Sequence, residues 1–155
     1  MAELQEGAPA PDFTAQNERG ETVRLSDFRG KKLILYFYPK DNTPTCTVEA
    51  CNLRDHYEEL KAQGFEVLGV SPDSARKHQN FIGKHNLPFS LLVDPELKVI
   101  KAYGAWGKKK LYGREYEGVL RSTFVIDEEG RIEKIIRKVD AKNHAAQILE
   151  TLKAG

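Results

Sequence analysis

The sequence predicts an α/β protein in which a central mixed β-sheet is flanked by helices. Two short runs, Leu33–Tyr38 and Phe65–Val70, are apolar without alternation, as expected of strands buried on both faces. Segments with helical character alternate with these strands, which favours a layered sheet. The last third of the chain changes to two strands joined by a tight turn and then a helix, which adds antiparallel strands to the same sheet.

A short hairpin precedes the first buried strand. Phe13–Ala15 and Thr22–Leu25 flank a turn rich in polar residues and glycine. The helix after the first buried strand begins at Thr43, a suitable N-cap, with Pro44 at the first helical position. Gly64 marks its expected end, because glycine readily adopts the left-handed conformation that terminates helices.

The other elements follow from the same periodicities and turn signals. They are a helix from Asp73 or Ser74 to about His85, a strand over Phe89–Val93, a short helix around Glu96–Tyr103, strands over Leu120–Ile126 and Arg131–Arg137, and a C-terminal helix from about Lys142 to Lys153. No repeat, low-complexity tract or linker-like stretch interrupts the pattern. We therefore expect a single domain over residues 1–155.

The composition excludes several classes of protein. The 155 residues carry 24 Lys and Arg against 23 Asp and Glu, so a net charge of +1 gives no electrostatic reason to bind nucleic acid or a membrane surface. The longest apolar run is too short to span a bilayer, and the acidic N-terminal sequence does not resemble a signal peptide. Two cysteines cannot frame a secreted disulfide scaffold of this length. We expect a cytoplasmic protein whose cysteines serve redox or catalytic chemistry.

Cys46 lies in the first turn of the helix that begins at Thr43. It shares a 4-3-4-3 spacing with four residues further along, which places all of them within about 40° of one line on the helix surface. They are Ala50, Leu53, Tyr57 and Leu60. Free backbone N–H groups and the helix dipole favour a thiolate in the first turn. From Cys46 alone, a buried cysteine that only packs remains the alternative.

The residues around Cys46 favour catalysis. The segment from Pro39 to Cys51 reads PKDNTPTCTVEAC, which resembles the Pro-x-x-x-Thr-x-x-Cys motif of the peroxiredoxins. A second cysteine five residues after the first is similar to the peroxiredoxin Q (bacterioferritin comigratory protein) subfamily. The resemblance covers nearly the whole chain, although Thr45 stands where many relatives have Gly. Further matching segments are Pro11 with Phe13, Leu25–Phe28 with Gly30, Tyr103–Gly107, and Arg121–Phe124 with Asp127.

The resemblance implies a thioredoxin-like fold with an N-terminal β-hairpin extension, and a peroxidase that reduces hydrogen peroxide and small organic hydroperoxides. It identifies Cys46 with the peroxidatic cysteine, which attacks the O–O bond. Thr43 corresponds to the hydroxyl that contacts thiolate and peroxide, and Arg121 to the guanidinium that steadies both. Pro39 shields the pocket, and Glu49 orients the arginine.

Cys51 corresponds to the resolving cysteine of an atypical 2-Cys peroxiredoxin. Attack on peroxide leaves Cys46 as a sulfenic acid, which condenses with the Cys51 thiol of the same chain. The resemblance implies that thioredoxin, or glutaredoxin, then reduces the disulfide. Because an in-chain resolving cysteine requires no second subunit, we expect a monomer.

The spacing of the two cysteines also predicts a conformational change. Residues five apart in a helix have Cα atoms about 8–9 Å apart, whereas a disulfide tolerates only about 4.4–6.8 Å. The helix should therefore be intact through Cys46 in the reduced form. It should lose order somewhere between about Thr43 and Asp55 when the disulfide forms.

Other functions are weaker matches to the sequence. A thioredoxin-like disulfide oxidoreductase would need Cys-x-x-Cys, but a redox sensor or a holdase that uses the same cysteine pair remains open. The four histidines lack zinc-like spacing and no dinucleotide fingerprint occurs, so we expect neither a metal nor a cofactor. The basic run Lys108–Lys110, between Gly107 and Gly113, is interpreted as a solvated loop.

Overall fold

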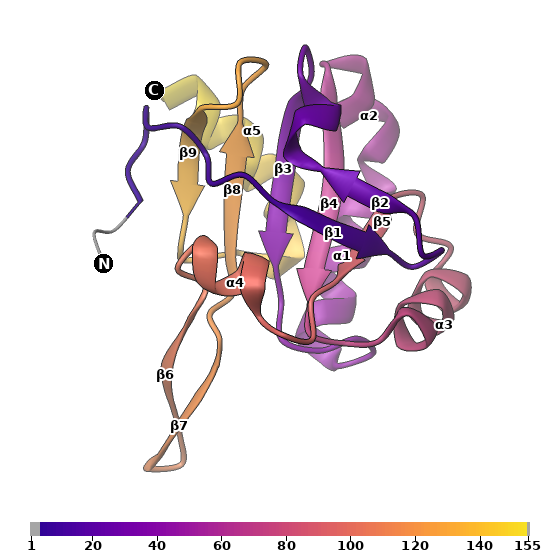
Figure 1. The fold of residues 1–155 in the computed structure, drawn as a ribbon, viewed down its shortest axis with the longest axis vertical. Helices are drawn as coiled ribbons and strands as arrows, with labels where there is room; N and C mark the ends of the chain where they lie inside the picture. The colour runs from indigo at the N-terminus through magenta and orange to yellow at the C-terminus, as the bar shows by residue number, and fades with distance from the viewer. Residues whose placement is uncertain (1–3, 155) are drawn as a thin grey trace.

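The computed structural model describes residues 4–154, and its centre is a seven-stranded sheet (Figure 1). The strands of this sheet are β1 (Thr14–Asn17), β2 (Thr22–Arg24), β3 (Lys32–Phe37), β4 (Phe65–Ser71), β5 (Ser90–Val93), β8 (Ser122–Ile126) and β9 (Ile132–Ile136). The helices are α1 (Pro44–Asp55), α2 (Tyr57–Ala62), α3 (Ala75–His85), α4 (Lys98–Ala102) and α5 (His144–Ala154), with 3-10 turns η1 (Leu25–Phe28) and η2 (Ala141–Asn143).

The strand order is β2-β1-β5-β4-β3-β8-β9. The strands β3, β4 and β5 run parallel. β8 continues the sheet antiparallel to β3, and β9 pairs antiparallel with β8. The N-terminal hairpin β1–β2 adds to the other edge by antiparallel pairing with β5. The expected mixed sheet and N-terminal hairpin are therefore confirmed.

Each face of the sheet carries its own apolar core, because successive side chains of a strand point to opposite faces. From the buried strand β3, Ile34 and Tyr36 pack with residues of α1, α2, α3 and α5. Leu33 and Leu35 pack on the opposite face with residues of η1 and α4. In Figure 1, α4 lies in front of the sheet, and α1 and α5 lie behind it. Helices thus cover both faces, as expected for a strand that is apolar throughout.

The helix expected from Thr43 to Gly64 is two helices, which corrects the sequence interpretation. α1 ends at Asp55 and α2 begins at Tyr57, with His56 between them at φ −109° and ψ 9°. The imidazole Nδ1 of His56 lies 2.9 Å from the backbone oxygen of Asn52, which also accepts from the His56 backbone N–H at 3.3 Å. The break leaves the buried stripe continuous, because Tyr57 and Leu60 still face the same core.

The interpretation of Lys108–Lys110 as a loop is wrong. These residues belong to β6 (Trp106–Leu111), which pairs with β7 (Arg114–Val119) as a separate two-stranded ribbon that projects from the body (Figure 1). Tyr112 and Gly113 form the turn, both with positive φ, which is the geometry of the tight hairpin turns that match strand twist.

Cross-strand charge pairing explains why this ribbon forms without an apolar face. Lys108 lies opposite Glu117, and Lys110 lies opposite Glu115. Opposite charges in directly facing positions stabilise antiparallel strands by roughly 0.2–1 kcal/mol each. A sequence interpretation based on apolar periodicity does not detect such strands.

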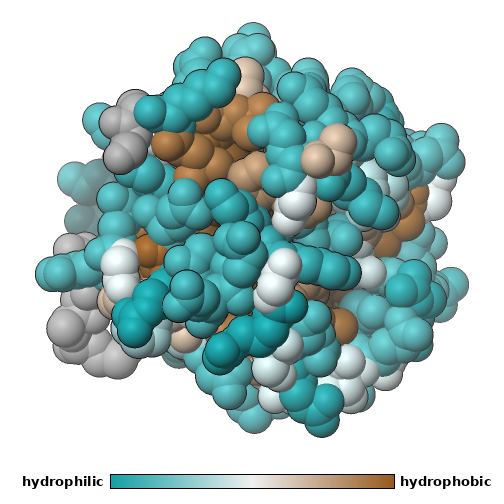
Figure 2. All heavy atoms as spheres, turned by 90° about the horizontal axis from the view of Figure 1, so that it is seen from above, coloured by the Kyte–Doolittle hydropathy of each residue, from teal (hydrophilic) through white to brown (hydrophobic). Residues whose placement is uncertain are grey.

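The end of the sheet at which β3 begins is mostly hydrophilic. Figure 2 views the molecule from the end of the sheet where β3 begins, and hydrophilic side chains dominate, with apolar ones gathered in recesses. Among residues 4–154, none of the helices is long and apolar enough to cross a membrane.

Candidate active site

Cys46 is placed by the start of α1, which follows the end of β3. Pro44 occupies the first turn after Thr43, as the sequence predicts. The side chain of Cys46 is 1% exposed and joins the core beneath α1. The predicted stripe from Cys46 to Leu60 is buried throughout. The thiol therefore lies at a helix N-terminus and at the carboxyl end of the central strand, where ligands bind in α/β sheets.

Arg121 reaches the same place from a distant part of the chain. The antiparallel register sets Ser122 opposite Phe37, so the residue before β8 lies beside the end of β3. The Arg121 Nη2 donates to the Sγ of Cys46 at 3.1 Å, and its Nη1 donates to Glu49 Oε1 at 2.6 Å. Glu49 is one helical turn after Cys46 and completely buried. One planar guanidinium thus joins the thiol and the carboxyl group.

Burial and charge act in opposite directions on these groups. Burial raises the pKa of Glu49 from 4.5 to about 7, although Arg121 acts to lower it. Burial lowers the pKa of Arg121, but the charges of Glu49 and Cys46 outweigh it, so that its pKa is raised. Arg121 is therefore a permanent cation whose guanidinium contacts the Cys46 sulfur.

Thr43 and Pro39 flank this cluster without joining it. The Thr43 hydroxyl donates to the backbone oxygen of Lys40 at 2.8 Å, which leaves the lone pairs of its oxygen free to accept a hydrogen bond. Pro39 is half-buried and lies two residues after the end of β3. The structure thus brings Cys46, Glu49 and Arg121 into contact and leaves Thr43 and Pro39 at the edge.

Cys51 lies on the same helix as Cys46, half-buried, and both thiols are free. The expectation of a helix through Cys46 in the reduced form is confirmed, because α1 runs unbroken across both cysteines. Residues five apart in such a helix are separated by about 8–9 Å between Cα atoms, so the two sulfurs cannot bond while α1 is intact.

Two residues behind Glu49 were not identified from the sequence. His144 Nε2 lies 3.5 Å from Glu49 Oε2, and the Thr123 hydroxyl lies 2.7 Å from the same nitrogen. His144 is fully buried and comes from the start of α5. Nothing in the local sequence of His144 signals this contact, because it depends on how α5 packs against α1.

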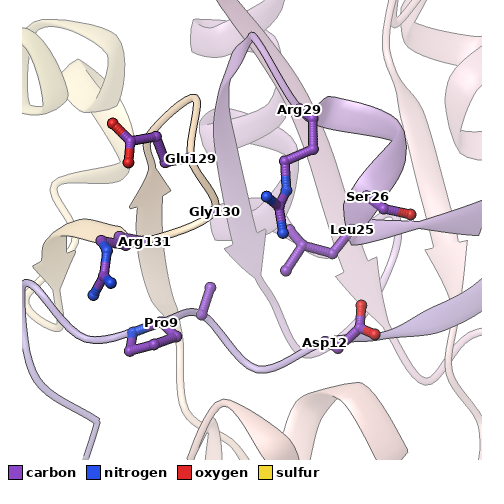
Figure 3. Close-up of a pocket in the computed structure, with 9 residues that line it drawn as sticks. Pro9, Asp12, Leu25, Ser26, Arg29, Glu129, Gly130 and Arg131 are labelled. Atoms are coloured by element: carbon purple, nitrogen blue, oxygen red, sulfur yellow. The ribbon is translucent and has the colours of Figure 1, made fainter.

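One hollow lies away from the thiol. A cavity of about 280 Å³ is lined by exposed arginines, Arg29 and Arg131, near Asp12 (Figure 3). Arg29 follows η1, before β3, and Arg131 follows β8, so this cavity lies at the end of the sheet opposite Cys46. Within residues 4–154, no group of three or more His, Cys, Asp or Glu is arranged to hold a metal ion.

Comparison with known proteins agrees with this geometry. Residues 7–135 match the model of the AhpC/TSA family. The chain is 53% identical to Peroxiredoxin Bcp of Bacillus subtilis over 150 residues, covering 97% of this chain and 96% of that protein.

Solved structures give the same result. A Cys-to-Ser mutant of PrxQ from Xylella fastidiosa superposes with a TM-score of 0.91 at 31% identity, covering 99% of this chain and 98% of the other. The bacterioferritin comigratory protein of Xanthomonas campestris, described for its alkyl peroxide reduction activity, superposes with a TM-score of 0.88 at 33% identity, covering 97% and 98%. These neighbours confirm the thioredoxin-like fold. The chain therefore belongs to the AhpC/TSA family, as a peroxiredoxin of the peroxiredoxin Q/Bcp group and hence a thiol peroxidase, and it carries a buried cysteine contacted by a half-buried arginine at the carboxyl end of the central strand.

Proposed function

We propose that Cys46 is the peroxidatic cysteine of this thiol peroxidase. The observation that carries the proposal is the Arg121 guanidinium, which contacts the Cys46 sulfur at 3.1 Å while Glu49 holds its other nitrogen. The thiolate attacks one peroxide oxygen, so that the S–O bond forms as the O–O bond breaks. The other oxygen leaves as an alkoxide or hydroxide and takes a proton to become an alcohol or water, and Cys46 remains as a sulfenic acid.

The magnitude of the rate enhancement shows why Arg121 matters. An unperturbed thiol is a few per cent ionised at pH 7, so complete ionisation gains only about thirty-fold, or near 2 kcal/mol. Enzymes commonly supply about a million-fold or more. The remainder has to come from aligning the peroxide and stabilising the charge on its leaving oxygen. Arg121, the Thr43 hydroxyl and the free N–H groups at the start of α1 can supply these effects.

Cys51 completes the proposed cycle as the resolving cysteine. Its thiol attacks the sulfenic acid, which forms the Cys46–Cys51 disulfide and releases water. Because α1 holds the two cysteines too far apart, at least part of this helix has to unwind before the bond can form. Unwinding also removes Cys46 from Arg121, so that the oxidised form cannot attack peroxide until it is reduced.

Hydrogen exchange tests the unwinding. We expect the amides between Thr43 and Asp55 to be protected in the reduced protein and to lose protection in the disulfide form, with the disulfide verified by mass. Protection over β4, a buried strand outside the segment expected to unwind, is the internal control. Equal protection of α1 in both forms would show that the disulfide closes by another route.

Small organic hydroperoxides are proposed as substrates beside hydrogen peroxide. A groove of about 380 Å³ beside the first turn of α1 supports this, because Pro44, Val48 and Val139 contribute apolar side chains to it. The related Xanthomonas protein is described for alkyl peroxide reduction. A dithiol protein, thioredoxin or else glutaredoxin, is proposed as reductant, and the protein is proposed to act as a monomer in the cytoplasm.

Peroxide consumption with thioredoxin and its reductase tests the assignment of the cysteines. Cys46→Ser should abolish turnover, because a hydroxyl does not ionise at neutral pH. Cys51→Ser should reduce one equivalent of peroxide and then stop. Normal turnover by Cys46→Ser would refute the mechanism. A single equivalent from the unaltered chain would indicate a redox sensor or holdase that uses the same cysteine pair.

A further inference from the structure

A buried acid–base pair lies directly behind the arginine that contacts Cys46. Glu49 Oε1 accepts from Arg121, but Glu49 Oε2 is buried and has no hydrogen-bond partner. His144 Nε2 faces it at 3.5 Å, and both side chains are completely buried. A carboxylate oxygen without a partner at this depth is costly. The positions of the protons in this pair therefore matter for the charge that Cys46 experiences.

The hydrogen-bond partner of Nδ1 determines where the neutral His144 ring carries its hydrogen. Nδ1 lies 2.9 Å from Oε1 of Gln147. Two backbone contacts orient that amide, since its nitrogen donates to the Lys138 oxygen at 2.8 Å and its oxygen accepts from the Asp140 nitrogen at 2.9 Å. An amide oxygen can only accept, so Nδ1 carries a hydrogen. A neutral ring then presents the lone pair of Nε2 to its other neighbours.

That lone pair accepts from the Thr123 hydroxyl at 2.7 Å, and Glu49 Oε2, which has no hydrogen-bond partner, faces the same nitrogen at 3.5 Å. If Glu49 were ionised and His144 neutral, two lone pairs would oppose each other in a region closed to water, and a net negative charge would lie beside the Cys46 thiolate. One further proton between Oε2 and Nε2 removes the repulsion and makes the pair neutral overall. The thiolate and Arg121 then balance each other, which is the least costly arrangement for buried charges.

The surroundings of the pair favour the carboxyl group as the place of this proton. Burial raises the pKa of Glu49 to about 7 and lowers that of His144 to about 4. The ionisable groups that act on the pair or on its partner arginine are Cys46 on α1, Tyr36 on β3, Arg121 before β8, Asp140 before η2 and Lys109 on β6. Burial, and then the charge of Glu49, raise the pKa of the Tyr36 hydroxyl well above its usual value, so Tyr36 stays neutral.

We propose that Glu49 and His144 share one dissociable proton, and that loss of this proton as the pH rises through neutrality sets an alkaline limit to peroxide reduction. With the proton, Glu49 still accepts from Arg121, and the full guanidinium charge acts on the thiolate and the leaving oxygen. Without it, the carboxylate neutralises Arg121 and adds a negative charge beside Cys46. His144 is therefore a positioning residue that acts through Glu49. The effect on rate rests on the proposed role of Cys46.

Nuclear magnetic resonance of the reduced protein tests the proton directly. With ¹³C-labelled glutamate and ¹⁵N-labelled histidine, we expect the Glu49 carboxyl signal to titrate with a midpoint near 7 and the His144 Nε2 signal to sense the same step. Glu49→Gln assigns both signals. His78 is the internal reference, because both of its ring nitrogens face oxygen acceptors and neither approaches Glu49. A Glu49 midpoint near the ordinary 4.5 would overturn the proposal.

A second variant links the proton to catalysis. Thr123→Val removes the hydroxyl that competes for Nε2, which leaves that lone pair to Glu49. We expect the midpoint of Glu49 to rise by about one pH unit, and the alkaline limb of the second-order rate with hydrogen peroxide to move by the same amount. Thr22→Val, on the edge strand β2, is the matched control and should move neither.

The two measurements separate the possible failures. A shifted Glu49 midpoint with an unshifted rate profile would overturn the alkaline limit while leaving the role of Cys46 intact. If Thr123→Val does not fold, the unaltered protein still tests the proposal. The pH at which its rate with hydrogen peroxide falls should coincide with the Glu49 midpoint, and a clear difference between the two would refute the proposal. The spectroscopic midpoint requires no turnover, so it is independent of the Cys46→Ser test.

Discussion

Two buried histidine–carboxyl pairs lie near the carboxyl ends of the central strands, and their hydrogen bonds are satisfied to different degrees. In the first pair, His78 Nδ1 lies 2.6 Å from Asp41 Oδ2, and His78 Nε2 lies 2.8 Å from the Leu92 oxygen. In the second pair, Glu49 Oε2 has no partner nearer than His144 at 3.5 Å. Only the second pair retains an atom that can gain or lose a proton without breaking a hydrogen bond.

The remaining contacts of Asp41 explain what the first pair does. Its Oδ1 accepts from the Tyr38 hydroxyl at 2.5 Å, and its backbone N–H donates to Asp73 Oδ2 at 2.7 Å. These bonds tie the segment between β3 and α1 to the end of β4. The contacts of Asp41 hold the loop next to Cys46, whereas Glu49 and His144 are proposed to adjust the charge at Cys46. Substitutions in the two networks should have different effects.

The largest effect is expected from the reactive network, at Arg121. Arg121→Ala should slow the reaction of reduced protein with peroxide about 10²–10³-fold, because a preorganised donor at the developing charge is lost. The fold should persist, since Glu49 can take up a proton when its partner is removed. Arg121→Lys should rescue poorly, because an ammonium group cannot present a planar fork to sulfur and carboxyl together. A loss below about threefold in stopped-flow measurements would remove Arg121 from the mechanism.

A substitution in the structural network should instead affect stability. His78→Leu removes the partner of the buried Asp41 Oδ2, while Oδ1 keeps its bond from Tyr38, and it should lower the free energy of unfolding by about 3–5 kcal/mol in urea titrations. The rate with peroxide, per folded molecule, should fall far less than in Arg121→Ala. Asn80→Leu, an exposed position on the same helix, is the control and should change stability by less than about 0.5 kcal/mol. Equal stability of the two variants would contradict this distinction.

The smallest expected effect concerns acid stability. Because the pKa of Glu49 is raised from 4.5 to about 7, the folded state binds more protons and gains stability as pH falls through that range. The pKa of His144 is lowered from 6.5 to about 4, so the folded state binds fewer protons and loses stability as pH falls through that range. The two effects largely cancel.

Glu49→Gln should remove this cancellation. Acidification from pH 7 to about 4.5 should then lower the stability of the variant by roughly 2 kcal/mol more than that of the unaltered chain. The comparison requires urea midpoints of both proteins at both pH values. A parallel response of the two proteins would show that Glu49 does not titrate in this range.

The sequence predicts the body of the fold because burial leaves periodic traces. The uninterrupted apolar run at Leu33–Tyr38 is the central strand β3, and the stripe from Cys46 to Leu60 faces the core. The β6–β7 ribbon leaves no such trace, since charge pairs such as Lys108 with Glu117 replace an apolar face. The only sequence feature that indicates this ribbon is the turn at Tyr112 and Gly113, where glycine suits the positive φ of a tight hairpin turn.

The candidate site is predictable to a similar extent. Cys46 and Glu49 are neighbours on one helix, and Arg121 was inferred from a resemblance that spans the chain. His144 lay outside such reasoning, because its contact with Glu49 depends on the packing of α5 against α1 and not on spacing. Thr43 stays a sequence-based assignment, since its hydroxyl contacts the Lys40 backbone.

Glu49 lies between Cys46 and Cys51 in the chain, on the helix that has to unwind. In the proposed cycle, closing the disulfide carries Glu49 away from Arg121 and into water, where its affinity for a proton falls. Oxidation then releases that proton between about pH 4.5 and about 7, and reduction takes it up again. The reduction potential of the disulfide therefore rises more steeply on acidification than the two thiols alone would dictate. Mild acid thus shifts the cysteine pair towards its reduced, peroxide-reactive form.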